Sequence, residues 1–150
     1  MPQNQLSKPH NSTKKMARLI LIDVNLIIGD SNTPKEASVV LSLKGQRITA
    51  KHLAEANEDS LATVATATLK AVQEALPVSV EFTLRNAIKL NPQFLDTPLL
   101  VVIADLAYGR SKYELTGACQ CEEPMMHRGI AQAALDATNR LVQFILSETF

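Results

Sequence analysis

The sequence is poor in the residues that build many nucleotide-binding and base-binding surfaces. Its 150 residues include no tryptophan, only two tyrosines and four phenylalanines, and five glycines. So few aromatic rings leave little material for a platform on which bases or sugars could stack. So few glycines leave no glycine-rich loop of the kind that cradles phosphate groups. These absences argue against proteins that recognise nucleotides or stacked bases.

An excess of charge of one sign is also missing. The 15 lysines and arginines equal the 15 aspartates and glutamates, so a protein that binds polyanions through a general basic surface is disfavoured. No apolar run approaches the roughly 20 residues of a membrane span. The basic and apolar stretch 14–28 is interrupted by Asp23 and Asn25, and no cleavage pattern for a secretory signal follows it. We therefore expect a soluble, cytoplasmic protein with no membrane partner, and nucleic acid is an unlikely partner.

The apolar content that is present suffices for one domain. Hydrophobic residues make up 46% of the chain. A chain of this length buries roughly 70% of the surface that its unfolded form exposes, so it needs neither a disulfide nor a metal to fold. The polar stretch 1–15 predicts a disordered tail. Residues 16–150 predict a single domain.

The order of the predicted elements repeats. Three runs of β-branched and aliphatic residues predict strands, a helical run follows, and the same order then returns. The predicted fold class is therefore α+β, with duplicated strand-strand-strand-helix units at 16–76 and 77–150, antiparallel strands, two amphipathic helices and a pseudo-two-fold relation. The predicted strands cover residues 19–28, 37–43, 47–54, 78–90, 99–106 and 113–121, and the predicted helices cover 60–76 and 125–146.

Matching residues support the duplication. In the strands, Ser38–Leu41 matches Leu100–Ile103, and in the helices Val64–Ala71 matches Ile130–Ala137. A longer turn in residues 108–112 accounts for the change of spacing between these two matches.

One predicted strand, residues 99–106, is apolar on both faces, whereas residues 37–43 alternate as expected of a strand with one wet face. Two helices can hardly cover both faces of six strands, and each exposed aliphatic side chain forgoes about 1.5–3 kcal/mol of burial. A second subunit is the simplest cover, and an internally curled sheet is the alternative. The two apolar sets are Leu99, Val101 and Ile103 on one face and Leu100, Val102, Ala104 and Leu106 on the other.

Candidates for chemistry are few. No nucleophile with a base and an orienting acid is apparent, so no catalytic residue is predicted. Asp23 and Asp105 interrupt apolar strands, where a partly buried carboxylate can have a shifted pKa, or where the strand has simply reached solvent. Asn25 and Asn86 occupy similar places in the first strand of each unit, where buried amides could bind a ligand or satisfy a β-bulge. These four residues are weak candidates for ligand binding.

Two cysteines lie close together near the second predicted helix. Cys119 and Cys121 are two apart and share one face of a strand, where an ordinary disulfide cannot form between them. His127 and Glu122–Glu123 follow. Because structural zinc needs four ligands and catalytic zinc three plus water, we expect small half-buried thiols rather than a metal site. Cys119, Cys121 and His127 are the weak metal candidates, and no cofactor is predicted.

Residues 37–76 look like the later part of a double-stranded-RNA-binding domain. Those domains present a basic helix start to the phosphates. Here acidic residues occur at 57–60 and 122–123, before the two predicted helices, so the basic surface of those domains is missing.

A second resemblance covers residues 18–146 and includes the doubling. The stretches Ala37–Gly45, Ala71–Leu76 and Ala134–Leu141 resemble the C-terminal regulatory domain of the α-isopropylmalate synthase and citramalate synthase family. The resemblance implies two strand-strand-strand-helix units that dimerise and bind an end-product amino acid between them, as an allosteric signal. This chain has no counterpart of that family's catalytic barrel. In that family, a segment with glycine, proline and an acidic residue tends to precede the first helix. This chain has Thr63-Val64-Ala65-Thr66 there instead.

The sequence therefore predicts a non-catalytic regulatory or interaction module. We expect a homodimer that binds a small metabolite or a partner protein at the dimer or inter-unit crevice. The alternatives are a protein resembling double-stranded-RNA-binding domains and a small enzyme of unknown reaction. Such an enzyme would use Asp23, Asp105 or the group formed by Cys119, Cys121 and His127.

Overall fold

The computed structural model describes residues 18–30 and 33–149, so the predicted tail at 1–15 lies outside the described residues. The α+β fold is confirmed, as two units that each contain three strands and a helix. The first unit consists of β1 (Leu19–Ile27), β2 (Glu36–Leu43), β3 (Gln46–Leu53) and α2 (Ser60–Ala75). The second consists of β4 (Glu81–Leu90), β5 (Leu99–Tyr108), β6 (Ser111–Gln120), the short 3₁₀ helix η2 (Glu123–Met125) and α3 (Met126–Thr149).

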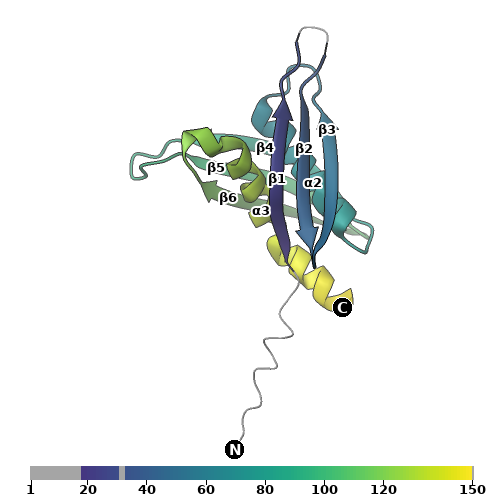
Figure 1. Ribbon diagram of the computed structural model, residues 1–150. Coiled ribbons are helices and arrows are strands. Elements are labelled where there is room, and N and C mark those ends of the chain that lie inside the picture. The colour runs from purple at the N-terminus through teal and green to yellow at the C-terminus, as the bar shows by residue number, and fades with distance from the viewer. Residues whose placement is uncertain (1–17, 31–32, 150) are drawn as a thin grey trace, which may run out of the picture.

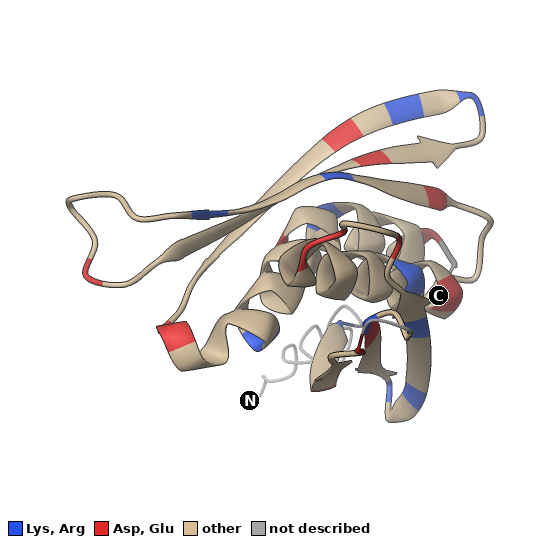
Figure 2. Cartoon of the chain, turned by 90° about the horizontal axis from the view of Figure 1, so that it is seen from above, with Lys and Arg blue, Asp and Glu red and all other residues tan. Residues whose placement is uncertain are grey.

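Each unit forms its own antiparallel three-stranded sheet, with strand orders β1-β2-β3 and β4-β5-β6. The strands of the two sheets run across one another (Figure 1), and the two helices lie between the sheets (Figure 2). Each helix packs on its own sheet and also reaches the other unit, since α2 contacts β4 and α3 contacts β1. The two units therefore share one core, and both sheets turn one face away from the helices.

The core between the sheets is aliphatic and rich in alanine, which lets the helices approach the sheets closely. Its polar members are threonines whose hydroxyls bond to the preceding turn of their own helix, so the hydroxyls are satisfied without water. Thr68 Oγ1 donates to the Val64 carbonyl at 2.8 Å, and Thr138 Oγ1 donates to the Leu135 carbonyl at 3.1 Å. The largest buried side chains are Leu41, Leu100, Leu106, Ile130, Ile145 and Leu146.

The helix match between the units is confirmed by burial. Every buried position from Thr63 to Leu76 corresponds to a buried position from Gly129 to Val142, in the alignment that pairs Val64 with Ile130. The two helices therefore present equivalent faces to equivalent surroundings.

The predicted strand match is wrong by one residue. In β1 the ladder shifts between Leu21 and Asp23, and in β4 it shifts between Leu84 and Asn86, so both units carry a β-bulge at the same place. Leu21 pairs with Leu41, and its counterpart Leu84 pairs with Ala104, which makes Ala104 rather than Ile103 the counterpart of Leu41. Because β5 is apolar on both faces, its hydrophobic pattern could not distinguish the two registers.

The extra length of the second hairpin lies in its strands and not in its turn. Both hairpins turn through two residues, Lys44–Gly45 and Gly109–Arg110. Positive φ angles at Lys44, Gly45 and Gly109 fit such tight turns. The second hairpin adds the pairs Ala107–Lys112 and Tyr108–Ser111 beyond the point where the first one ends. The prediction of a longer turn at 108–112 was therefore wrong.

Candidate functional site

The outer face of the β4–β6 sheet is divided into an apolar half and a charged half. Alternate residues of β5, from Leu100 to Leu106, are buried against the helices, so their neighbours point outward. Both helices lie between the sheets, and neither covers this outer face (Figure 2). From the pairings, the apolar half contains Ile88, Leu90, Leu99, Val101, Ile103 and Ala118 beside the polar Thr116 and Gln120, and the charged half contains Glu81, Thr83, Arg85, Asp105, Lys112 and Glu114.

The fold does not demand an apolar residue at every position of the apolar half. In β2, the outward residues that correspond to Leu99 and Val101 of β5 are Glu36 and Ser38. The first unit thus builds the same sheet with polar side chains at these positions. Burial is the usual reason for aliphatic residues on a central strand, yet the second unit carries Leu99 and Val101 on a face that its own chain leaves partly exposed.

The charged half forms an open groove of about 660 Å³. Arg85, the residue inserted at the β4 bulge, lies between two carboxylates. Its Nε is 3.5 Å from Asp105 Oδ2, and its Nη1 pairs with Glu114 Oε2. All three side chains are about half exposed, at 52%, 51% and 57%. Exposed pairs of this kind contribute about 0–1 kcal/mol, so a ligand of mixed charge can exchange with them at small cost.

Lys112 lines the same groove from β6 and makes no ion pair with any described residue. The groove therefore presents cationic and anionic groups side by side. Sequence reasoning missed Arg85, Lys112 and Glu114. Lys112 and Glu114 are two residues apart, so the sequence places both charges on one face of a strand, and this was a usable signal for a charged site. The bulge that directs Arg85 toward them could not be recognised in the sequence pattern.

The four predicted ligand-binding candidates all lie on outer faces. Asp105 belongs to the groove, and Asn86 pairs with Ile103 where the two halves of the face meet. Asp23 and Asn25 lie on the outer face of the other sheet, on the far side of the helices. The structure therefore brings Asp105 together with Arg85 and not with Asp23.

The expectation of buried amides is corrected. Asn25 and Asn86 are both exposed. The bulge interpretation is confirmed in part, because the inserted residues Ile22 and Arg85 directly precede Asp23 and Asn86. The register also makes Asp23, and not Asn25, the counterpart of Asn86. Because both asparagine side chains reach water, their amide groups need no buried hydrogen-bond partner near the bulge.

The two cysteines are free and half-buried at the end of β6, and His127 is exposed on α3. Burial raises the pKa of the Cys119 thiol, and the nearby Asp136 carboxylate raises it further. Burial likewise raises the pKa of Cys121, with contributions from Cys119 and Glu123. Within residues 18–30 and 33–149, no three or more His, Cys, Asp and Glu side chains gather in a way that could hold a metal ion.

A polar network at the start of α2 was also missed from the sequence. The Lys70 ammonium is 3.1 Å from His52 Nδ1. Because an ammonium only donates, Nδ1 accepts, and Nε2 carries the proton that it donates to Glu58 Oε2 at 3.1 Å. Burial opposes ionisation of Glu58, but hydrogen bonds from Thr63, the Glu55 backbone and His52 outweigh it and lower its pKa. The network fastens β3 to the helix start, and both ring nitrogens of His52 are already engaged.

No known family matches the chain, and no curated protein is similar to it at a significant level. Among the described helices, none combines the length and apolar character that crossing a membrane requires.

Proposed function

We propose that this chain is a non-catalytic, cytoplasmic regulatory module that forms a homodimer through the apolar half of the β4–β6 outer face. The charged groove then lies beside the dimer contact and takes a small metabolite. The observation that carries the proposal is the contrast between Val101 in β5 and its counterpart Ser38 in β2. The fold accepts a polar residue at this position, so the apolar one serves a contact outside the unit.

A second copy is the occupant that fits this face best. Two copies related by a two-fold axis place the same patch against itself, which suits a face with one apolar half and one half of mixed charge. Three strands about 4.8 Å apart and ten residues long cover roughly 500 Å², and the apolar half is about half of this, roughly 250 Å². This area is below the roughly 800 Å² per partner of a stable interface. Phe94, which is 85% exposed in the loop between Leu90 and Leu99, adds to it. We therefore expect a dimer of micromolar affinity.

The groove supports a small ligand that carries both charges. Arg85 and Lys112 can meet a carboxylate, and Glu81, Asp105 and Glu114 can meet an ammonium group. An amino acid, the ligand class implied by the resemblance to the regulatory domains of α-isopropylmalate and citramalate synthases, has both groups. The family relationship and the ligand remain part of the proposal.

The dimer is tested by Val101→Lys, with Ser38→Lys as the matched control at the equivalent outward position of the other sheet. In sedimentation velocity across a concentration series, the wild type and Ser38→Lys should associate from monomer to dimer. Val101→Lys should stay monomeric while keeping its circular dichroism spectrum. A wild type that stays monomeric at millimolar concentration, or a Val101→Lys variant that dimerises normally, would show that this face is not the contact.

The ligand is tested by isothermal titration calorimetry with the proteinogenic amino acids. One of them should bind, and Arg85→Ala should remove the binding without changing the dimer. Arg47→Ala, an exposed arginine on the outer face of the other sheet, should leave it intact. Absence of binding by every amino acid would reject this ligand class and leave the dimer proposal standing.

A further inference from the structure

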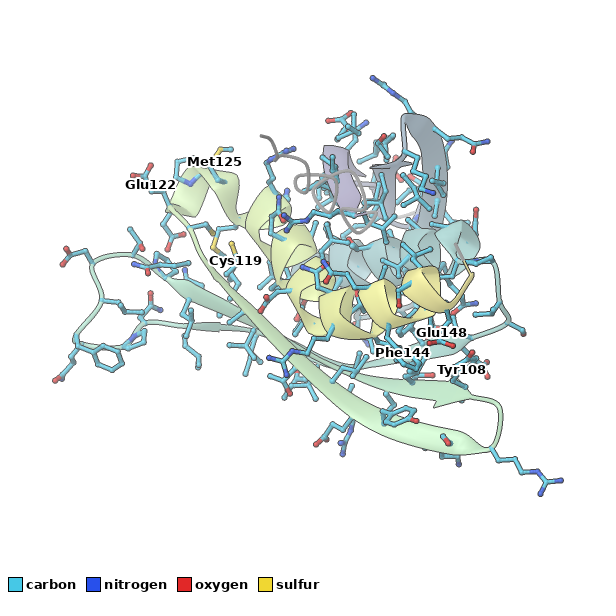
Figure 3. The ribbon with its side chains drawn as sticks, turned by 90° about the horizontal axis from the view of Figure 1, so that it is seen from below. Tyr108, Cys119, Glu122, Met125, Phe144 and Glu148 are labelled. Carbon is cyan, nitrogen blue, oxygen red and sulfur yellow. The ribbon has the colours of Figure 1, made fainter. Side chains whose placement is uncertain are left out.

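Sulfur is concentrated where β6 leads into α3. The chain has two cysteines and four methionines, and both cysteines and two of the methionines fall within residues 119–126. Figure 3 shows Cys119 and Met125 at the same end of the second unit, away from the end that carries Tyr108 and Phe144. The segment therefore gathers soft donor atoms in one place, on the helix-facing side of the sheet and distinct from the outer groove.

Backbone pairing turns the two thiols to the same side. Cys119 pairs with the buried Leu100 and so faces the helices. The Cys121 N–H donates to the Pro98 carbonyl at 3.2 Å, which continues the pairing one residue beyond β6. Cys121 Sγ lies against Gly129, where an added Cβ would be only 2.4 Å from the sulfur. Glycine at this position of α3 therefore leaves room for the thiol.

The spacing suits a bridging ion better than a disulfide. Alternate residues of a strand lie about 6.6–6.8 Å apart along the chain, at the upper limit of the roughly 4.4–6.8 Å between Cα atoms that disulfides span. A metal ion with two metal–sulfur bonds of about 2.3 Å joins sulfurs that are up to roughly 4.6 Å apart. The strand thus places both thiols on one side, with their Cα atoms at the far end of the range for a disulfide, and a bridging ion adds length between the sulfurs.

The first unit shows that the fold does not need these thiols. The Ala54 N–H donates to the Lys35 carbonyl at 2.8 Å, as Cys121 does to Pro98, which makes Ala54 the counterpart of Cys121. His52, two residues earlier, is the counterpart of Cys119. The first unit therefore builds the same turn with histidine and alanine, and only the second unit has the two thiols.

The chemistry of the thiols narrows the choice of ion. Burial raises the pKa of both thiols, and the negative charges of Asp136 and Glu123 nearby raise it further, so an ion that binds here must form strong bonds to sulfur and displace both protons. Thiolates and thioethers select soft ions such as Cu(I) over magnesium or calcium. Zinc needs at least three protein ligands, and the described residues offer no such group. Two thiols match the low coordination number of a monovalent soft ion.

We propose that Cys119 and Cys121 bind one thiophilic monovalent cation, represented by Cu(I), through their two sulfur atoms. On binding, both S–H bonds break, two metal–sulfur bonds form, two protons pass to solvent, and the oxidation state of the metal does not change. Met125 and Met126 follow in the next turn, so their thioethers, the closest to the thiols in sequence, are the candidates for a third ligand.

The test uses the reduced full-length chain under anaerobic conditions and Cu(I) held by a coloured chelator. The wild type should withdraw one equivalent of Cu(I), seen as a loss of the chelator's absorbance. Cys119→Ser and Cys121→Ser should each weaken binding more than about 100-fold, beyond the loss seen when an outer partner of a metal ligand is removed. Ala118→Ser, on the opposite face of the same strand, should bind like the wild type.

Two further readouts keep the test decisive if a serine variant folds poorly. X-ray absorption of the wild-type complex should show two or three sulfur ligands, and bound Cu(I) should protect both thiols from alkylation by iodoacetamide. Coordination dominated by nitrogen or oxygen, unprotected thiols, or unchanged binding by the double serine variant would overturn the proposal. So would a chelator that keeps all of its copper.

Discussion

α3 packs closely on its sheet at Gly117 of β6, and Gly117→Ala should destabilise the protein strongly. An added Cβ would lie 2.2 Å from the Ala137 amide nitrogen and 2.3 Å from the Ala133 carbonyl oxygen. These atoms belong to the helix backbone, so they cannot turn aside as a side-chain end would. Ordinary contact requires α3 to retreat by about 1 Å, a gap that forfeits a quarter to a half of each dispersion contact across it.

The magnitude follows from two opposing effects. Overpacking a core costs about 1–3 kcal/mol, and the rigid neighbours place Gly117→Ala at the upper end. Replacing glycine also restricts the unfolded chain, which stabilises by about 0.4–1 kcal/mol. The net loss is therefore about 2–2.5 kcal/mol. At about 2–4 °C per kcal/mol for a domain of this size, the melting temperature should fall by roughly 4–10 °C.

Differential scanning calorimetry measures this effect, and the first unit supplies the control. Ala50 occupies the equivalent position in β3, where a Cβ is accommodated against α2. Ala50→Gly should therefore cost only about 0.5–1 kcal/mol. A Gly117→Ala variant that melts within about 2 °C of the wild type, less than the shift expected for 1 kcal/mol, would refute the close packing of α3 on β6.

Two further predictions concern α2 and the thiols. Asp59 caps α2, because its side chain accepts a hydrogen bond from the Ala62 N–H at 2.8 Å. Asp59→Ala should therefore lower the free energy of unfolding in urea by about 1 kcal/mol, while Asp59→Asn keeps the cap. Equal losses in both variants would contradict the capping role. The raised pKa values of Cys119 and Cys121 mean that the folded state holds thiol protons that the unfolded state releases above the usual thiol pKa of 9.0. The folded state therefore keeps the full stabilisation from these protons below pH 9.0 and loses it as the pH rises through the pKa values of the two thiols in the folded state. The urea midpoint should therefore fall between neutral pH and about pH 10, and less steeply in the Cys119→Ser/Cys121→Ser variant; identical slopes in the two proteins would contradict the shifts.

The sequence predicted the order and type of the elements because each carries a clear local signal. The alanine-rich helix at 60–76 and its repeat show a wide apolar face, and their alignment holds position by position. The register of β5 could not be derived, since an apolar residue occupies every position from Leu99 to Ala104 and either alignment buries aliphatic side chains.

The candidate groove was predicted only through Asp105. Its partner Arg85 is aimed by a bulge, which depends on the pairing of β4 with β5. The other charged residues come from a strand distant in sequence, Lys112 and Glu114 of β6. Such a site arises from the hydrogen-bonded pairing of the strands, so the pattern of β6 alone shows two charges on one face but not the residues of β4 and β5 that they meet.

The outer face of the first sheet mixes polar and apolar residues, since Glu36 and Ser38 lie on the same face as the exposed Ile20, Ile27 and Leu53. In the proposed dimer, two copies joined through their β4–β6 faces present these β1–β3 faces at its two ends. Had both sheets carried the residues of β5, every copy would have had two adhesive surfaces on opposite sides, and stacking would continue head to tail into an open filament. In the proposed dimer, Glu36 and Ser38, at the positions where the second unit has Leu99 and Val101, interrupt the apolar surface of the first sheet and so disfavour this continued stacking.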